Sequence, residues 1–188
     1  MLAFILAIAT IVFSNAAFGQ SASVQTKQYE NGGFYKGTFK NGRQHGYGTY
    51  SLPSGYQYEG EWDNGQAVGE GVAKFSNGSV YTGTFSNGKP NGIGAIIYAD
   101  GSKYTGIWVE AQIEGEGIAE YPDGTRYEGE FLANKYHGRG VLVLKSGYSY
   151  EGTWVNGVKE GLGKVTYADG AIYHGELISD KRSGKGSL

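Results

Sequence analysis

Two pairs of carboxylates have the residue type and the spacing for acid and base catalysis. Glu59 and Glu61 stand two residues apart in the segment YEGEW, and Glu128 and Glu130 repeat the arrangement in YEGEF. One member of such a pair can donate a proton while the other accepts one. An extended strand places residues i and i+2 on the same face, and here that is the polar face. We interpret both pairs as solvated and predict no catalytic residue.

The segment GEGVAK, residues 69–74, has a glycine spacing similar to that of a phosphate-binding loop. Such a loop leads into a helix, and the N-terminus of that helix receives the phosphate. No helical pattern follows this segment. We therefore expect no nucleotide and no other cofactor.

The chain has three histidines, His45, His137 and His174, and no cysteine. His45 and His137 occupy the same position of a repeat, four units apart. In a sheet this separates them by on the order of 38 Å, so they cannot share a metal ion. There is no cysteine nucleophile and no plausible Ser, His and Asp triad. The sequence therefore indicates a non-enzymatic protein without a metal site.

Tyrosine recurs at a constant spacing of 23 residues through most of the chain. When each of these tyrosines is numbered position 1 of a unit, glycine fills positions 3, 12 and 14 of every unit and position 21 of the first six. A fixed period of this length is the signature of a repeat architecture. The tyrosines that set the register are Tyr35, Tyr58, Tyr81, Tyr104, Tyr127, Tyr150 and Tyr173.

The alternation within each unit is typical of β-strands. Positions 1, 3 and 5 share one face of an extended strand, and this face reads aromatic, glycine, aromatic. Positions 12, 14, 16 and 18 read glycine, glycine, apolar, apolar, whereas positions 2 and 4 are mostly Glu, Thr and Lys. Glycine within a strand costs about 0.5 to 1 kcal/mol. We therefore expect each of these glycines to make room for an aromatic ring from a neighbouring strand in an antiparallel sheet.

Positions 7 and 8 form the turn between the two strands of a unit. They read Asn-Gly in four units, and this pair suits the positive φ angles of a tight hairpin turn. Glu110-Ala111 breaks the rule, so we expect a distorted turn there. A single hairpin is not stable alone, which means that the units must stack.

The chain begins with a charge-free segment whose apolar run, Leu2 to Phe13, is short for a membrane span. Ala17 and Gly19 are small residues, as a signal peptidase requires. Residues 1–19 are therefore predicted to be a signal peptide, with an uncleaved anchor as the alternative, and residues 20–28 a short linker. The predicted location is exported, either periplasmic or extracellular. A net charge of −2 without a Lys or Arg cluster argues against nucleic acid as a partner.

The unit YEGEWDNGQAVGEGVAKFSNGSV, residues 58–80, resembles the MORN repeat (membrane occupation and recognition nexus), which has the pattern Tyr-Glu-Gly-x-Trp-x-Asn-Gly, then Gly-x-Gly, then Asp-Gly. The resemblance covers residues 29–188, as a half-unit (29–34), six full units (35–172) and a partial seventh unit (173–188). It implies an all-β MORN repeat protein, and the N-terminal segment described above makes it one of an exported type. Its fold would be a single-layer, twisted antiparallel sheet solenoid of hairpins, on the order of 65 Å long, with both faces wet.

Family resemblance also implies a face that clasps a peptide or another protein, so we expect a binding or scaffolding module. Aromatic side chains are frequent anchors at protein interfaces. The candidate partner-binding residues are Tyr58, Trp62, Tyr81, Phe85, Tyr104, Trp108, Tyr127, Phe131, Tyr150 and Trp154. Alternatively, these rings only hold the sheet together.

Two other ligands and a self-association fit the sequence less well. Basic residues near the hairpin turns suggest binding to anionic phospholipid, although such binding usually needs a cluster of four to eight Lys or Arg. Aromatic rings also stack on sugars, so a cell-wall glycan is a further alternative. The last unit presents a terminal strand, and an exposed edge favours a homodimer or strand addition by a partner. The possible lipid-facing residues are Arg43, Lys89, Lys135, Lys159, Lys181 and Arg182.

Overall fold

The computed structural model describes residues 23–187, which form fifteen β-strands and no helix. The predicted signal peptide or anchor, residues 1–19, lies outside the described residues. The strands are β1 (Gln25–Gln28), β2 (Phe34–Lys40), β3 (Arg43–Ser51), β4 (Gln57–Asp63), β5 (Gln66–Lys74), β6 (Val80–Ser86), β7 (Lys89–Ile97), β8 (Lys103–Val109), β9 (Gln112–Glu120), β10 (Arg126–Leu132), β11 (Lys135–Val143), β12 (Ser149–Val155), β13 (Val158–Thr166), β14 (Ile172–Ile178) and β15 (Lys181–Ser187).

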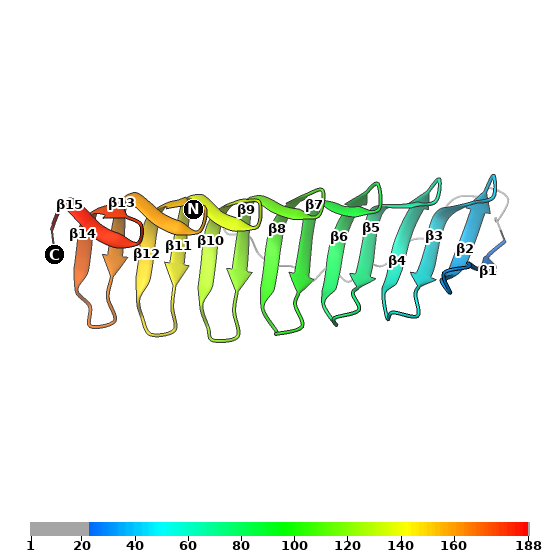
Figure 1. Ribbon diagram of the computed structural model, residues 1–188, viewed down its shortest axis with the longest axis horizontal. Helices are drawn as coiled ribbons and strands as arrows, with labels where there is room; N and C mark the ends of the chain where they lie inside the picture. Colours follow the sequence, from blue (N-terminus) through cyan, green and yellow to red (C-terminus); the bar gives the residue numbers. More distant parts are fainter. Residues whose placement is uncertain (1–22, 188) are drawn as a thin grey trace, which may run out of the picture.

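The strands form one antiparallel sheet whose spatial order is the order of the chain, β1 to β15 (Figure 1). Each strand forms its backbone pairing only with its neighbours in sequence, as stacked hairpins require. The predicted all-β, single-layer repeat fold is thus confirmed. The array starts earlier than expected, because Gln25–Gln28, at the end of the expected linker, forms β1 and pairs with β2.

The expected distortion at Glu110-Ala111 is wrong. Both residues adopt positive φ angles, 49° and 67°, as Ala133 and Asn134 do in the next unit, and Val109 pairs with Gln112 directly beside the turn. The turn is held from the preceding unit: the Ala111 N–H donates to the Pro90 carbonyl (2.9 Å) and Glu110 pairs with Lys89 (2.8 Å). These contacts offset the cost of a left-handed backbone without glycine or asparagine.

The glycines at positions 3 and 14 make room for the ring of the position 1 tyrosine. For position 14 this ring comes from the neighbouring strand, as predicted, whereas for position 3 it comes from the same strand. In the second unit Tyr58 lies over Gly60 of its own strand and Gly71 of the adjacent strand. A Cβ at either glycine would come within 2.5 Å of the Tyr58 hydroxyl oxygen. That hydroxyl donates to the Glu61 carbonyl at 3.1 Å. The tyrosine is 2% exposed.

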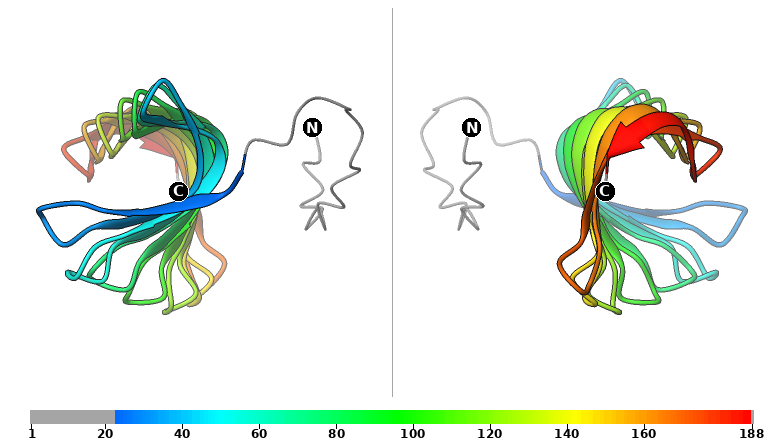
Figure 2. Two further views of the ribbon diagram at one scale, coloured as in Figure 1. Left: turned by 90° about the vertical axis from the view of Figure 1, so that its right-hand side faces the viewer. Right: turned by 90° about the vertical axis from the view of Figure 1, so that its left-hand side faces the viewer.

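The glycines at position 12 have a different role from the one predicted. They do not lie under a tyrosine ring; instead all seven have a positive φ, between 57° and 99°, beside a break in strand pairing such as the one between Gly60 and Glu61. A bulge of this kind bends its strand and increases its twist. Its recurrence in every hairpin accounts for the curved cross-section of the sheet (Figure 2).

The core lies on one face of the sheet, here called the core face, and no second layer covers it within residues 23–187. From the second unit to the sixth, each position 5 ring packs edge-on between the tyrosine of its own unit and that of the preceding one. Trp62, for example, lies 5.2 Å from Tyr58 and 5.1 Å from Tyr35 between ring centroids. The Trp62 Nε1–H donates to the Gly48 carbonyl (3.1 Å). The expectation of two wet faces is therefore wrong for the middle of this face, where the position 1 tyrosines are 0 to 6% exposed.

Adding one methyl group beneath a tyrosine should destabilise the array. In Gly117→Ala the new Cβ would lie 2.5 Å from the Tyr104 ring, and overpacking of this kind costs about 1 to 3 kcal/mol. We expect a lower urea midpoint, followed by circular dichroism. The control is Gly157→Asn, which places a side chain where the structure has nothing within 4 Å and where the fifth unit carries Asn134 at the same φ sign. A midpoint reduced equally by both variants would contradict the role assigned to the ring.

The buried tyrosines should make the fold sensitive to alkaline pH. Burial raises the pKa of Tyr81 to about 12, with a smaller contribution from Glu70, and burial also raises the pKa of Tyr58, Tyr104 and Tyr127. An unfolded chain releases these protons near pH 10, whereas the folded chain retains them. The stabilisation is therefore complete below about pH 10 and decreases as the pH rises towards the folded pKa. Phenolate absorbance and circular dichroism should change together; early ionisation of these rings in an intact sheet would contradict this.

Candidate binding face and aromatic pocket

The ten aromatic residues proposed from the sequence all lie on the core face, and all are buried. Their exposed fractions run from 0% for Tyr81, Tyr127 and Tyr150 to 8% for Trp62. In this state they brace the sheet and present little surface to a partner. Their direct contact with a partner stays a prediction.

A second set of aromatic residues covers this buried layer and remains half-exposed. We call it the aromatic row. None of these residues was a binding candidate from the sequence, because several lie at positions 16 and 18, where an apolar side chain already fitted the strand pattern. The row consists of Tyr29, Phe39, Tyr50, Tyr56, Phe75, Tyr98, Tyr136, Tyr148 and Tyr167.

Position 10 is the point on the core face where successive units differ most in chemistry. Its residues pair across the hairpin with position 5, as Phe131 does with Tyr136. They are Gln44, Ala67, Pro90, Ile113, Tyr136, Lys159 and Arg182. This column therefore gives each unit a different surface on a constant frame.

The Tyr136 ring lies between the rings of Tyr127 and Trp154 on the core face. It stacks on Tyr127, with centroids 3.7 Å apart and planes 9° from parallel, and meets Trp154 edge-on at 5.3 Å. Its hydroxyl lies 2.7 Å from the Tyr121 hydroxyl. Burial, followed by the hydrogen bond with Tyr121, raises the pKa of Tyr136. The phenol is therefore neutral at physiological pH.

Lys159 points into the core face instead of towards a lipid surface. Its ammonium lies 5.1 Å from the ring centre of Tyr148, 5.6 Å from that of Tyr150 and 5.7 Å from that of Trp154, all within cation–π range. It donates to the Tyr148 hydroxyl at 3.1 Å and lies 3.9 Å from an Asp180 oxygen. The sequence did not reveal this cage, because its members come from separate strands.

The six basic residues proposed as a lipid-facing edge do lie beside the hairpin turns, but on two faces. Lys159 and Arg182 are at position 10, and Arg182 lies over the Tyr173 ring at 5.5 Å. Arg43, Lys89, Lys135 and Lys181 are at position 9, which faces the other way because strand residues alternate. Lys89 is paired with Glu110. These residues do not form one cationic patch.

The face opposite the core face carries the carboxylates and some exposed apolar residues. Glu59 accepts a hydrogen bond from the Tyr47 hydroxyl (2.9 Å), and Glu130 accepts one from the Arg139 N–H (2.9 Å) beside a bulge. Ile93 and Leu162 are 73% and 75% exposed, so this face is less polar than the alternation at positions 2 and 4 indicated.

The three histidines do not form part of a metal-binding cluster in the part of the chain that the structure describes. His45 lies 3.1 Å from an Asp63 oxygen, and no group of three or more His, Asp or Glu could hold a metal ion among residues 23–187.

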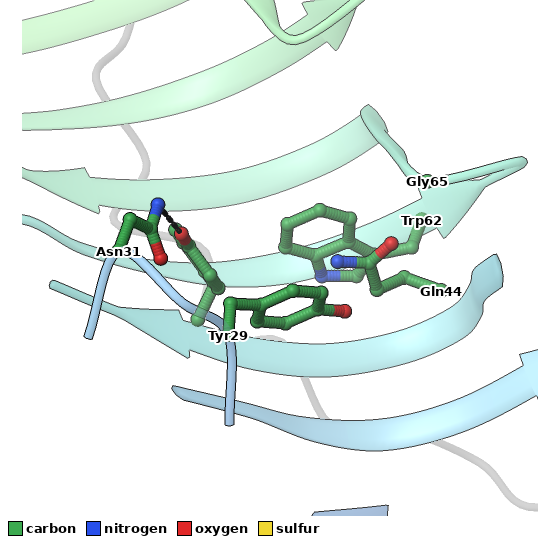
Figure 3. Close-up of a pocket in the computed structure, with 6 residues that line it drawn as sticks. Tyr29, Asn31, Gln44, Trp62 and Gly65 are labelled. Atoms are coloured by element: carbon green, nitrogen blue, oxygen red, sulfur yellow. Dashed lines mark hydrogen bonds between the residues drawn. The ribbon is translucent and has the colours of Figure 1, made fainter. Parts of the chain in front are cut away.

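A pocket of about 280 Å³ opens on the core face at its N-terminal end (Figure 3). Tyr29 and Trp62 form walls, and the Gln44 side chain extends towards both of them. The Asn31 amide N–H donates to the Tyr50 hydroxyl at 3.2 Å, which fixes the orientation of that ring. The lining residues are Tyr29, Asn31, Gln44, Tyr50, Trp62 and Gly65, and we call this site the aromatic pocket.

Comparison with solved structures finds matches at low sequence identity. The TCP domain of Drosophila melanogaster SAS-4 (dCPAP), solved with a proline-rich motif of Ana2 (dSTIL), is 12% identical and has a TM-score of 0.47, over 88% of this chain and 86% of that one. The G-box domain of the microcephaly protein CPAP is 13% identical and has a TM-score of 0.46, over 83% and 100%. The Danio rerio CPAP TCP10 domain is 12% identical and has a TM-score of 0.31, over 85% and 89%. These scores are too low to carry a functional argument.

Comparison with curated proteins gave no significant sequence match. None of the described residues belongs to a helix that is long and apolar enough to cross a membrane. The MORN repeat, in contrast, matches seven times in succession, over residues 35–55, 58–80, 81–103, 104–126, 127–147, 150–172 and 173–188. MORN repeats generally bind proteins or lipids and are typically not enzymes. With matches across most of its length and a sheet built from the same units, the chain belongs to the MORN repeat family.

Proposed function

We propose that the protein is a non-enzymatic binding or scaffolding module of the cell envelope or the secreted space, and that it clasps a peptide or protein on its core face. The observation that carries this proposal is the aromatic row. A run of half-exposed rings along one curved face is chemically suited to holding an extended partner. The export signal inferred from residues 1–19 supports the proposed location.

The aromatic row has the physical character of a protein-binding surface. Tyrosine combines a rigid apolar ring with a polar tip, so it buries much area at a low cost in conformational entropy. The rings are also held by the layer beneath: Tyr148 and Tyr167 lie 6.1 Å apart, and Tyr56 and Phe75 lie 6.0 Å apart. A partner would therefore meet a largely preorganised surface.

Phospholipid and glycan are weaker proposals for this surface. Within residues 23–187 only Arg43, Lys135 and Lys181 of the six basic residues lack an ion pair or a cation–π contact, fewer than the clusters that bind anionic membranes. Stacking on a sugar needs an open ring face, and the rings at positions 1 and 5 other than Phe39 are buried, so only the half-exposed rings of the aromatic row remain for this ligand. A homodimer through the last strand would bring together Lys181, Arg182 and Lys185 of two copies, and like charges oppose such pairing.

Photo-crosslinking can test which face binds. A benzophenone amino acid placed at Tyr98 lies on the core face, half-buried in the aromatic row. The same group at Ile93 lies in the same hairpin but on the opposite face, at a site that is 73% exposed. We expect a protein from the native host extract to crosslink through position 98 and not through position 93. Equal crosslinking from both positions, or from position 93 alone, would contradict the proposal.

Flotation with anionic phospholipid vesicles provides the matching control. The protein should remain in the unbound fraction at physiological salt. Flotation that is abolished by Lys135→Glu together with Lys181→Glu would instead identify a lipid-binding protein.

A further inference from the structure

We infer that the aromatic pocket receives a tyrosine side chain from a peptide partner. This inference deepens the proposed function and rests on it. It identifies one site on the core face and the chemistry that the site accepts.

The array contains the same site a second time, with a ring already in it. Four units further along, 92 residues on, Tyr29 corresponds to Tyr121, Trp62 to Trp154 and Gly65 to Gly157, all with the same residue type. Gln44 corresponds to Tyr136. The walls are therefore repeated, while the tyrosine that fills the space in the fifth unit is replaced by glutamine in the first.

The contacts of Tyr136 show what this space accepts. Its ring stacks on Tyr127, lies edge-on to Trp154 and Phe131 at 5.3 and 5.5 Å, and places its hydroxyl 2.7 Å from that of Tyr121. The first unit presents the same four partners. They are Tyr35, Trp62, Phe39 and Tyr29.

Two further lining residues differ, because Tyr50 corresponds to Leu142 and Asn31 corresponds to Asp123, but the space remains open. The Tyr50 ring is larger than the Leu142 side chain and, if it were turned inwards, would fill the pocket itself. Its hydroxyl is instead drawn away to the Asn31 amide (3.2 Å) and lies over Gly33, which has no side chain to oppose it. Thr125, at the end of the fourth unit, stands at the corresponding place. About 280 Å³ remains beside Gln44 and Trp62.

The charges around the pocket favour a neutral guest. The sixth unit holds the Lys159 ammonium among aromatic rings, and Asp180 lies 3.9 Å from it. At the aromatic pocket the residue that corresponds to Asp180 is Gly65 of the second unit, which has no carboxylate. The ammonium of Lys27 already lies over the Tyr29 ring at 5.1 Å. A lysine side chain in the pocket would meet a like charge, whereas a phenol would not.

Gln44 supplies a polar group for the backbone of the guest. Its side-chain amide forms no hydrogen bond within residues 23–187 and extends into the pocket (Figure 3). A carboxamide can donate to a peptide carbonyl and accept from a peptide N–H. The site thus combines an aromatic slot, a hydroxyl for the phenol and an amide for the main chain.

The three tryptophan indole N–H groups provide the readout. The blocked tripeptide Ac-Gly-Tyr-Gly-NH2 is titrated into the ¹⁵N-labelled protein. We expect a saturable shift of the Trp62 indole signal, while the Trp108 and Trp154 signals stay in place. Ac-Gly-Phe-Gly-NH2 should bind more weakly, because it lacks the hydroxyl that meets Tyr29. The lysine and alanine tripeptides should bind weakest. A lysine peptide that binds as tightly as the tyrosine peptide would overturn the inference.

Two exchanges between the first and fifth units sharpen the test. Gln44→Tyr should fill the pocket with a ring of the protein itself and weaken binding of the tyrosine tripeptide by about tenfold or more. Tyr136→Gln should open a second pocket, so that the Trp154 signal also shifts. Because Tyr136→Gln removes a buried ring, circular dichroism must show that this variant still forms the sheet. If it does not, Gln44→Tyr alone tests the inference, because that variant keeps every core residue. Unchanged binding in Gln44→Tyr would overturn the inference.

If the Trp62 indole signal does not shift when the tyrosine tripeptide is added, the pocket assignment is overturned, but the proposed function is not affected. Crosslinking through position 98 reports on the core face as a whole, and it does not depend on the pocket. Loss of that crosslinking alone would point to failure of the proposed function.

Discussion

The tyrosine that lies flat over two glycines is the contact on which the rest of the structure depends. Tyr58 covers Gly60 and Gly71, and its hydroxyl donates to the Glu61 carbonyl just beyond the point where strand pairing shifts. The ring therefore packs against two strands and also ties down the bulge. Because the hydrogen-bonded hydroxyl lies beside Gly69, whose φ is +57°, packing and bending occur at one place in every hairpin.

This contact explains how a single sheet buries a core without a second layer. A ring standing upright on a flat sheet would expose most of its surface, whereas a ring lying on glycine is covered from below by the backbone and from the sides by the position 5 rings. Tyr58 touches Trp62 at 5.2 Å and Phe85 at 4.9 Å, and the pattern continues from unit to unit. The buried layer thus holds the sheet together, and only the half-exposed rings that pack against it remain accessible to a partner.

Much of this architecture could be predicted from the sequence, because a period of 23 residues and a period of 2 within each strand both leave direct traces in residue type. The bulge could not. A glycine needed for a positive φ, such as Gly69, looks the same as a glycine needed for space, such as Gly71. The turn at Glu110-Ala111 was misjudged because its support comes from Pro90 and Lys89 of another unit. The aromatic pocket was also invisible, because its members come from three units that only the curved sheet brings together.

Repetition makes the differences between units more informative than the similarities. Residues shared by all units are needed to form the sheet itself, so they do not indicate where on the array a particular ligand would bind. Position 10 lies outside the tyrosine and glycine contact, and it carries an amide, a proline, a phenol and two cations in different units. Where most of the surrounding rings are the same, as at Gln44 and Tyr136, the exchange of that one side chain has the largest effect on the free space beside it. A regular array can therefore hold sites of different chemistry along one face while its backbone stays constant.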